Sequence, residues 1–336
     1  MGGRRSPSAF YCAEKRCITQ TRLRAGEKSG IVNAVSLLSL FAVEGYFPMI
    51  QHDVPAGVPR MPLERYIRRA WPMAPARAVR DLLKRRDAKV NGARCGADAM
   101  VAGGDRLALY LPDAYLPDRA VFAFDDGRLA VAVKPQGLPV DVDRDGVGAD
   151  TLLARVSAVH PGAQLCHRLD AATGGLVMLA LDDRTAAQAL EAFRIHALRK
   201  RYFALASGGF ERSEGVLRAW LCKDARRAEV RVVHHREKGA KEIETRYRVI
   251  DEAGGIARVL LEPVTGRTHQ LRAHMADFGH PLLGDDRYGD RALNRRAPGP
   301  LRLWCGELEI DSDSPLADYR GMQFAAQPPA WWENGG

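Results

Sequence analysis

The residues best suited to chemistry lie in two short segments about a hundred positions apart. Residues 167–176 read HRLDAATGGL, and residues 266–272 read GRTHQLR. The first segment places one carboxylate, Asp170, before a Thr-Gly-Gly turn, and glycines in a turn allow close approach of a ligand or of another backbone. The second segment brings several cations to the predicted start of a helix. A carboxylate paired with cations differs from the two flanking carboxylates of glycoside-processing enzymes.

These residues also have ordinary structural interpretations when each is taken alone. An aspartate before Thr-Gly is most often a simple turn residue. Arg168 could end a strand and bridge to a neighbour, Tyr202 could be a half-buried core tyrosine, and Arg272 could be a surface helix charge. The functional interpretation therefore depends on the whole set of motifs.

The motif set resembles the RluA-type pseudouridine synthases, which isomerise uridine within RNA. Residues 167–176 match the family's HRLDxxTSGL motif, except that one glycine of the Gly-Gly pair stands where the family has serine. Residues 200–202 (KRY) match its K-x-Y motif. Residues 133–140 (VKPQGLPV) resemble NKPxGLxV with Val133 in place of asparagine, and residues 279–289 (GHPLLGDDRYG) resemble GHPxxGDxxYG. All occur in the family's order, over about residues 120–336.

The resemblance implies a cofactor-free isomerisation and assigns roles to individual residues. Asp170 would be the catalytic carboxylate, with Arg272 beside it to pair with it and aim it. Tyr202 would stack on the target uracil, and its hydroxyl is a candidate for taking the C5 proton. Arg168 would take the place of the flipped base, since a planar guanidinium both stacks and hydrogen-bonds. Further substrate or RNA contacts are expected at His167, Thr173, Lys200, Arg267, His269 and Gln270.

The elements that must position these residues are short strands and a few helices. A hairpin is predicted at 121–124 and 129–133, a buried strand at 176–181 and a helix over about 183–196. Residues 165–169 are strand-like, and Thr268 is expected to cap a helix that stops at Gly279. Further strands are predicted at 202–206, 216–221, 244–250 and 257–261. This pattern predicts an α+β fold with a mixed, mainly antiparallel sheet, and the resemblance implies the pseudouridine synthase type.

A small basic α/β unit is predicted at residues 60–112. It holds 12 Lys/Arg against 5 Asp/Glu, a net charge of +7. Residues 1–59 carry +3, so the total of +9 leaves about −1 for residues 113–336. Helices at about 63–70 and 76–86, the KVNG turn at 89–92 and a strand at 106–111 resemble the alpha-L RNA-binding domain. The alternative is an ordinary solvated basic surface. RNA phosphate contacts are expected at Arg65, Arg69, Arg80 and Lys84.

The expected organisation is a poorly ordered extension (1–59), the alpha-L domain (60–112), a linker (113–119) and a catalytic domain (120–336). The apolar run at 31–47 is interrupted by polar residues and is marginal in length for a membrane span. The six cysteines form no C-x-x-C pair and the histidines show no zinc spacing. We therefore expect a reduced cytoplasmic protein, with no metal and no membrane partner, and in the simplest case a monomer.

The expected function is isomerisation of uridines in structured RNA. Family members with an alpha-L domain mostly act on large-subunit ribosomal RNA, so 23S ribosomal RNA is the favoured partner. Two alternatives stay open: a transfer RNA target, and a non-catalytic RNA-binding factor in ribosome assembly. The second would be expected to lose Asp170, Tyr202 or Arg272, and all three are present.

Overall fold

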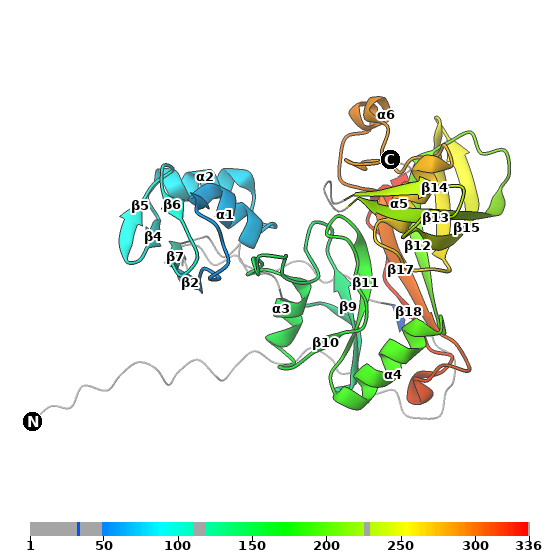
Figure 1. Ribbon diagram of the computed structural model, residues 1–336, viewed down its shortest axis with the longest axis horizontal. Coiled ribbons are helices and arrows are strands. Elements are labelled where there is room, and N and C mark those ends of the chain that lie inside the picture. Colours follow the sequence, from blue (N-terminus) through cyan, green and yellow to red (C-terminus); the bar gives the residue numbers. More distant parts are fainter. Residues whose placement is uncertain (1–31, 34–48, 111–118, 225–228, 335–336) are drawn as a thin grey trace, which may run out of the picture. The chain divides into compact units, whose positions relative to one another are not determined.

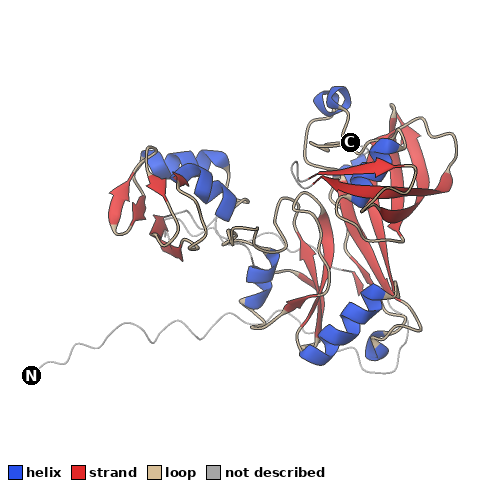
Figure 2. Ribbon diagram, in the orientation of Figure 1, coloured by secondary structure: helices blue, strands red, loops and turns tan. Residues whose placement is uncertain are grey.

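The computed structural model describes residues 32–33, 49–110, 119–224 and 229–334 (Figures 1 and 2). Residues 49–110 form a small unit with its own sheet and hydrophobic core. Its helices are α1 (Leu63–Ala70) and α2 (Ala76–Lys84). Its strands are β2 (Met49–Asp53), β3 (Met61–Pro62), β4 (Ala88–Val90), β5 (Ala93–Cys95), β6 (Met100–Val101) and β7 (Arg106–Tyr110).

The two helices of the small unit form where helical spacing of apolar residues predicted them. Leu63, Tyr66 and Ile67 of α1 are fully buried, and α2 buries Val79 and Leu83 against them. The arginines of both helices stay on the opposite faces, as an amphipathic pattern requires. The sheet has the order β2-β7-β4-β5, and the turn between β4 and β5 uses positive φ angles at Asn91 and Gly92.

The predicted start of this unit at residue 60 is wrong. Strand β2 pairs antiparallel with β7 along all five of its residues, and Val54 and Val58 belong to the small unit's core. Residues 49–59 are therefore part of the folded unit rather than of an extension. The cause is tertiary: no residue of β2 is buried, and the strand is stabilised by backbone pairing with β7, which its own sequence does not signal. Most of residues 1–48, and all of the predicted linker 113–119 except Arg119, lie outside the described residues.

A single sheet of twelve strands organises the remaining described residues. Its main path runs β14-β13-β15-β16-β12-β17-β11-β9-β8, with β1, β10 and β18 attached at the side. The strands are β1 (Val32–Asn33), β8 (Phe122–Asp125), β9 (Leu129–Lys134), β10 (Gln164–Leu165), β11 (Gly174–Ala180), β12 (Leu198–Ser207), β13 (Glu214–Asp224), β14 (Glu229–Val233), β15 (Lys241–Ala253), β16 (Ile256–Pro263), β17 (Leu303–Ile310) and β18 (Gln323–Ala325). Only two of its pairings, β11–β17 and β1–β18, are parallel within the described ranges. The mixed, mainly antiparallel α+β fold is therefore confirmed.

Helices are few beside this sheet (Figure 2). They are α3 (Leu152–Ser157), α4 (Asp183–Arg194), α5 (Gln270–Asp277), α6 (Arg291–Arg296), α7 (Trp331–Asn334) and a 3-10 turn, η2 (Ala317–Tyr319). Helix α4 packs on β11, and α5 packs against β13 to β16. No helix in the described part of the chain has the length and apolar composition needed to cross a membrane.

Three central strands, β11, β12 and β17, position the residues of interest. Strand β11 is buried along its whole length, which explains its continuous apolar run. The glycine pair at its start permits the close parallel approach of β17: a Cβ on Gly175, at φ +111°, would lie 2.2 Å from the Cys305 carbonyl oxygen. A side chain at this position would force β11 and β17 apart.

Two local predictions near the motifs were wrong. Strand β10 ends at Leu165, so the segment that carries Asp170 is irregular rather than a strand. Helix α5 begins at Gln270 and its N-cap is His269, in the left-handed region at φ 54° and without a capping hydrogen bond from its side chain. Thr268 lies one residue too early to cap it. Strands β14, β17 and β18 and helices α3, α6 and α7 were not predicted either.

Candidate active site

Asp170 lies on a tight turn between β10 and β11. The backbone N–H of Thr173 donates to the carbonyl oxygen of Asp170 at 3.0 Å, which closes the turn. The Asp170 side chain is 26% exposed, so a substrate can reach its carboxylate. The turn therefore presents a rigidly held anion at the surface.

Arg272 faces this carboxylate from the buried side of α5, as the sequence predicted. Its Nη1 lies 3.5 Å from Oδ2 of Asp170. The guanidinium is itself held by Asp285, with Nε–Oδ2 at 2.7 Å and Nη2–Oδ1 at 2.8 Å, and by Asp286 at 3.0 Å. Burial opposes its charge, but the bonds to Asp285 prevail and raise the pKa of Arg272. It therefore remains a cation of fixed direction beside Asp170.

His269 is a second neighbour of the carboxylate. Its Nε2 lies 3.7 Å from Oδ2 of Asp170, and its Nδ1 lies 2.9 Å from the hydroxyl of Tyr288. Burial lowers the pKa of His269 below its usual value, against the opposing effect of Asp170. The imidazole is therefore neutral at pH 7. Because it lies beside the reactive carboxylate, its place fits a contact to the target nucleotide better than one to the outer RNA backbone.

Tyr202 lies on β12 and is buried. Strand β17 separates β12 from β11, the strand that follows the Asp170 turn. The partner of Tyr202 across the β12–β17 pairing is Cys305, whose thiol pKa burial raises to about 12. Burial first, and then Cys305 and Asp170, raise the pKa of Tyr202 well above its usual value. The side chain is therefore a neutral phenol at pH 7. It can take a proton from a substrate only if it passes its own proton on.

Two of the expected RNA contacts are available at the surface. Arg168 and Arg267 are both exposed, and within the described part of the chain neither side chain has an ion pair or hydrogen bond. Arg168 lies two residues from Asp170, so its guanidinium can enter an RNA stack close to the carboxylate.

His167 and Lys200 are partly exposed, and both side chains have partners within the protein. His167 accepts a hydrogen bond from the backbone N–H of Met178 at 3.1 Å, and burial lowers its pKa to about 3. Lys200 lies with its ammonium 5.2 Å from the centre of the Phe193 ring, and burial lowers its pKa. His167 fastens the Asp170 segment to β11.

Gln270 and Thr173 are buried and contribute to the local structure around Asp170 and the start of α5. The Gln270 amide is buried, accepts the backbone N–H of Arg267 at 3.0 Å and donates to the carbonyl oxygen of Glu244 at 3.0 Å. It thereby joins the start of α5 to β15. Thr173 is 3% exposed and serves the Asp170 turn through its backbone.

Two functional residues were missed although their motifs had been recognised. Lys134 is fully buried, and its ammonium donates to the carbonyl oxygens of Leu138 at 2.7 Å and Ala171 at 3.0 Å. Burial lowers its pKa to about 7, and Asp170 opposes that shift. Asp285, which holds Arg272, is the other. Lys134 lies in the motif at residues 133–140, and Asp285 lies in the motif at residues 279–289. The motifs alone do not show which groups these two side chains contact.

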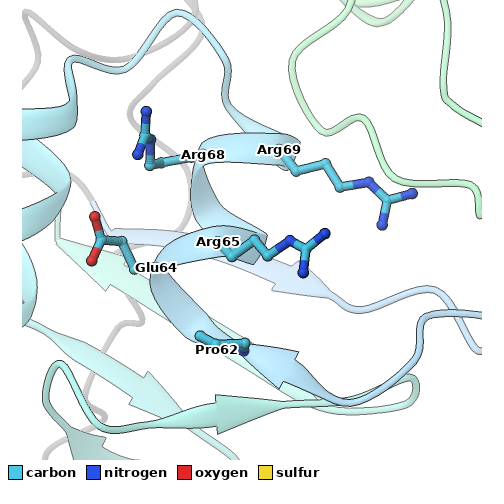
Figure 3. Close-up of a pocket in the computed structure, with 5 residues that line it drawn as sticks. All are labelled: Pro62, Glu64, Arg65, Arg68 and Arg69. Carbon is cyan, nitrogen blue, oxygen red and sulfur yellow. The ribbon is translucent and has the colours of Figure 1, made fainter.

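The small unit carries a hollow of about 510 Å³ on α1, lined by Pro62, Glu64, Arg65, Arg68 and Arg69 (Figure 3). The guanidinium groups of Arg65 and Arg69 extend to the same side of the helix (Figure 3). Arg69 is engaged in ion pairs with Asp143, at 2.6 Å, and with Asp145, so its predicted role as a free phosphate contact is not supported. Arg65 keeps an exposed side chain, as do Arg80 and Lys84 of α2.

No group of three or more His, Cys, Asp or Glu side chains in the described ranges is arranged to hold a metal ion. The site that the structure does assemble is one carboxylate, one buried arginine, one neutral histidine and one buried tyrosine. Such a set can act on a sugar–base bond by charge and proton transfer. It leaves open which molecule carries that bond.

Comparison with known proteins decides this question. Residues 128–277 match the family model of RNA pseudouridylate synthase. The chain is 34% identical over 192 residues to the dual-specificity RNA pseudouridine synthase RluA of Salmonella typhi, and the match spans 56% of this chain and 86% of that protein. The chain belongs to the RluA-type RNA pseudouridine synthases. As a member, it is an enzyme that isomerises uridine in RNA.

Further relatives agree with this assignment. The ribosomal large subunit pseudouridine synthase C of Vibrio vulnificus is 31% identical over 254 residues, with 69% of this chain and 78% of that protein covered. The solved structure of human RNA pseudouridylate synthase domain containing 1 has 25% identity and a TM-score of 0.52, over 63% of this chain and 83% of that one. The solved structure of human RNA pseudouridylate synthase domain containing 4 has 26% identity and a TM-score of 0.50, over 63% of this chain and 90% of that one. The pseudouridine synthase fold is therefore confirmed.

Proposed function

We propose that this pseudouridine synthase modifies 23S ribosomal RNA, as a cytoplasmic monomer, with Asp170 as its catalytic carboxylate. The observation that carries the catalytic part is the ion pair between Asp170 and Arg272 at 3.5 Å, on a carboxylate that is still reachable from solvent. A purely structural Asp–Arg pair has no need of that opening. Here the buried part of the site is the arginine, and the exposed part is the anion.

The reaction begins when the target uridine leaves the RNA stack, because its glycosidic bond is hidden there. Arg168 fills the vacated space, and the ring of Tyr202 lies against the uracil. Asp170 then attacks C1′ or stabilises the positive charge that develops there, and the C1′–N1 bond breaks. Both routes need an ionised carboxylate, which Arg272 orients.

The second half of the reaction rejoins the same two fragments. The freed uracil turns and its C5 bonds to C1′, and in the route by attack this displaces the Asp170 carboxylate from C1′. C5 then loses its proton and N1 gains one. Atoms and electrons balance without an oxidant or a cofactor. Because the Tyr202 phenol is neutral, its hydroxyl can act in this step only as a relay, receiving the C5 proton while giving up its own.

The basic character of the small unit supports the choice of RNA. Residues 60–112 carry a net charge of +7, and Arg65, Arg80 and Lys84 remain exposed. The match to the relative named for the large ribosomal subunit also spans more of this chain, 69% against 56%, than the match to the dual-specificity relative. A transfer RNA target is the second candidate, favoured by the name of the dual-specificity relative.

The test is release of tritium from RNA labelled at uridine C5. Transcripts of 23S ribosomal RNA and a transfer RNA pool are each incubated with the wild type and with Asp170→Asn. Release from ribosomal RNA alone, absent in the variant, is the expected result. Release from transfer RNA alone would overturn the proposed target, and release by Asp170→Asn would overturn the proposed catalytic residue.

A further inference from the structure

Helix α6 carries three arginines that the reaction does not use. Arg291, Arg295 and Arg296 are all exposed, and within the described ranges none of them has an ion pair or hydrogen bond through its side chain. The helix buries no residue. In Figure 1 it stands out from the sheet at the top of the view. Its arginines therefore do not stabilise the fold.

The helix is nevertheless held firmly at one point. Oδ1 of Asn294 accepts a hydrogen bond from the backbone N–H of Gly284 at 2.8 Å. Nδ2 of Asn294 donates a hydrogen bond to the backbone carbonyl oxygen of Asp285 at 2.8 Å. The turn beneath it is tight, because a Cβ on Gly289 would lie 2.2 Å from that carbonyl oxygen and 2.9 Å from Nδ2 of Asn294. Asn294 thus anchors α6 to the turn that bears Asp285.

This anchor connects α6 to the catalytic carboxylate by a short series of contacts. The side chain of Asp285 holds Arg272 through two bonds of 2.7 and 2.8 Å, and Arg272 lies 3.5 Å from Asp170. All of Asp285 and nearly all of Arg272 are buried, so these contacts leave little freedom. The backbone of α6 therefore lies at a fixed offset from Asp170.

We propose that α6 binds backbone phosphates of the substrate RNA beside the target uridine. The planar guanidinium matches phosphate geometry with two parallel hydrogen bonds. To make them, Arg295 and Arg296 would give up only a longer-range attraction to the carboxylate of Asp290. Residues 113–336 have a net charge of about −1, and the exposed Asp286 would repel a phosphate. The cations of α6 would offset this repulsion locally. Phosphate binding by α6 does not depend on the proposed catalytic role of Asp170. Only the effect of that binding on the rate of the reaction rests on it.

The first test compares the full chain with Arg291→Gln/Arg295→Gln/Arg296→Gln for binding to a 23S ribosomal RNA transcript at several salt concentrations. Loss of up to three phosphate contacts should make the slope of log K against log salt shallower by about 2–3 units, since each contact contributes about 0.7–0.9. The same triple change to lysine keeps the charge and should bind within about threefold of the wild type. An unchanged slope in the glutamine variant would overturn the proposal.

A matched control removes the same charge elsewhere. Arg184, Arg212 and Arg236 are also exposed and, in the described ranges, without a side-chain partner. Their joint change to glutamine should alter the slope by less than about one unit, because net charge alone then changes. An equal effect of the two triple variants would overturn a specific role for α6. Because the three arginines are exposed, the glutamine variant of α6 should have the same melting temperature as the wild type. An equal melting temperature shows that the fold of the variant is intact.

A second variant tests the anchor. Asn294→Ala keeps all three arginines but frees the helix from the Asp285 turn. The salt slope should stay unchanged while single-turnover tritium release falls about tenfold, because the bound phosphates no longer fix the uridine against Asp170. Unaltered turnover would refute the fixed offset. The salt slope is read from binding alone, so failure of the wild type to release tritium would sink the proposed function and still leave α6 tested.

Discussion

Arg272 offers a comparison between two carboxylates that hold the same guanidinium. Asp285 binds its Nε and Nη2 with no exposed side-chain surface, whereas Asp286 binds Nη2 at 3.0 Å with 80% of its side chain exposed. We predict that Asp285→Asn damages both stability and catalysis, and that Asp286→Asn damages neither. The two changes are identical in chemistry and adjacent in sequence, so each controls for the other.

The magnitudes follow from burial. Removing the charge of one partner from a buried ion pair leaves the other charge uncompensated, at a cost of about 3 kcal/mol or more in unfolding free energy. An exposed ion pair is worth about 1 kcal/mol or less, because water solvates both partners when it breaks. In Asp285→Asn the guanidinium keeps only Asp170 and Asp286, so it can shift toward either. A misplacement of about 1 Å lowers the rate by about 10²-fold.

The assay has two parts. Urea unfolding gives the free energy of unfolding for the wild type and both variants, and single-turnover tritium release gives the rate on bound RNA. RNA affinity should be unchanged in Asp285→Asn, because no RNA can reach a fully buried side chain. Equal losses of stability in the two variants would refute the reasoning from burial. An active Asp285→Asn variant would refute the claim that Asp285 aims Arg272.

Four further outcomes are expected. Asp170→Asn should abolish tritium release and keep RNA affinity within a few fold; full activity would sink the mechanism. Tyr202→Phe keeps the stacking ring, so affinity should hold while release falls by about 10²–10⁴-fold through loss of the proton relay, and an unchanged rate would exclude the hydroxyl. The pKa of Asp285 is lowered, since its bonds to Arg272 overcome burial, so its stabilisation is present above about pH 4 and lost as pH falls below it. Urea midpoints between pH 3 and 6 should therefore fall less steeply in Asp285→Asn. Glutamine at both Arg65 and Lys84 should flatten the salt slope of binding by about 1–2 units, and no change would remove the small unit from the RNA contact.

Local elements of the fold were predictable from sequence because their signals are local. Apolar residues at helical spacing located α1 and α2, and the continuous apolar run located β11. Strands β14 and β17 were missed, although β17 lies between β12 and β11 in the centre of the sheet. A strand of this kind is stabilised by pairing with strands far away in the chain, so its own sequence pattern does not predict it.

The site shows the same division. Residue types and motif order were enough to identify Asp170, to pair it with Arg272 and to imply the chemistry, because catalysis requires particular side chains. They did not separate His167 and Gln270, which are bonded to backbone groups of other strands, from Arg168 and Arg267, which face solvent. Whether a polar side chain points in or out depends on hydrogen-bond partners from other strands, such as Met178 and Glu244. The sequence thus determined the family and its reaction, and the tertiary structure alone decided which candidate side chains face solvent and which are bonded inside the protein, because burial and pairing arise only when distant segments pack together.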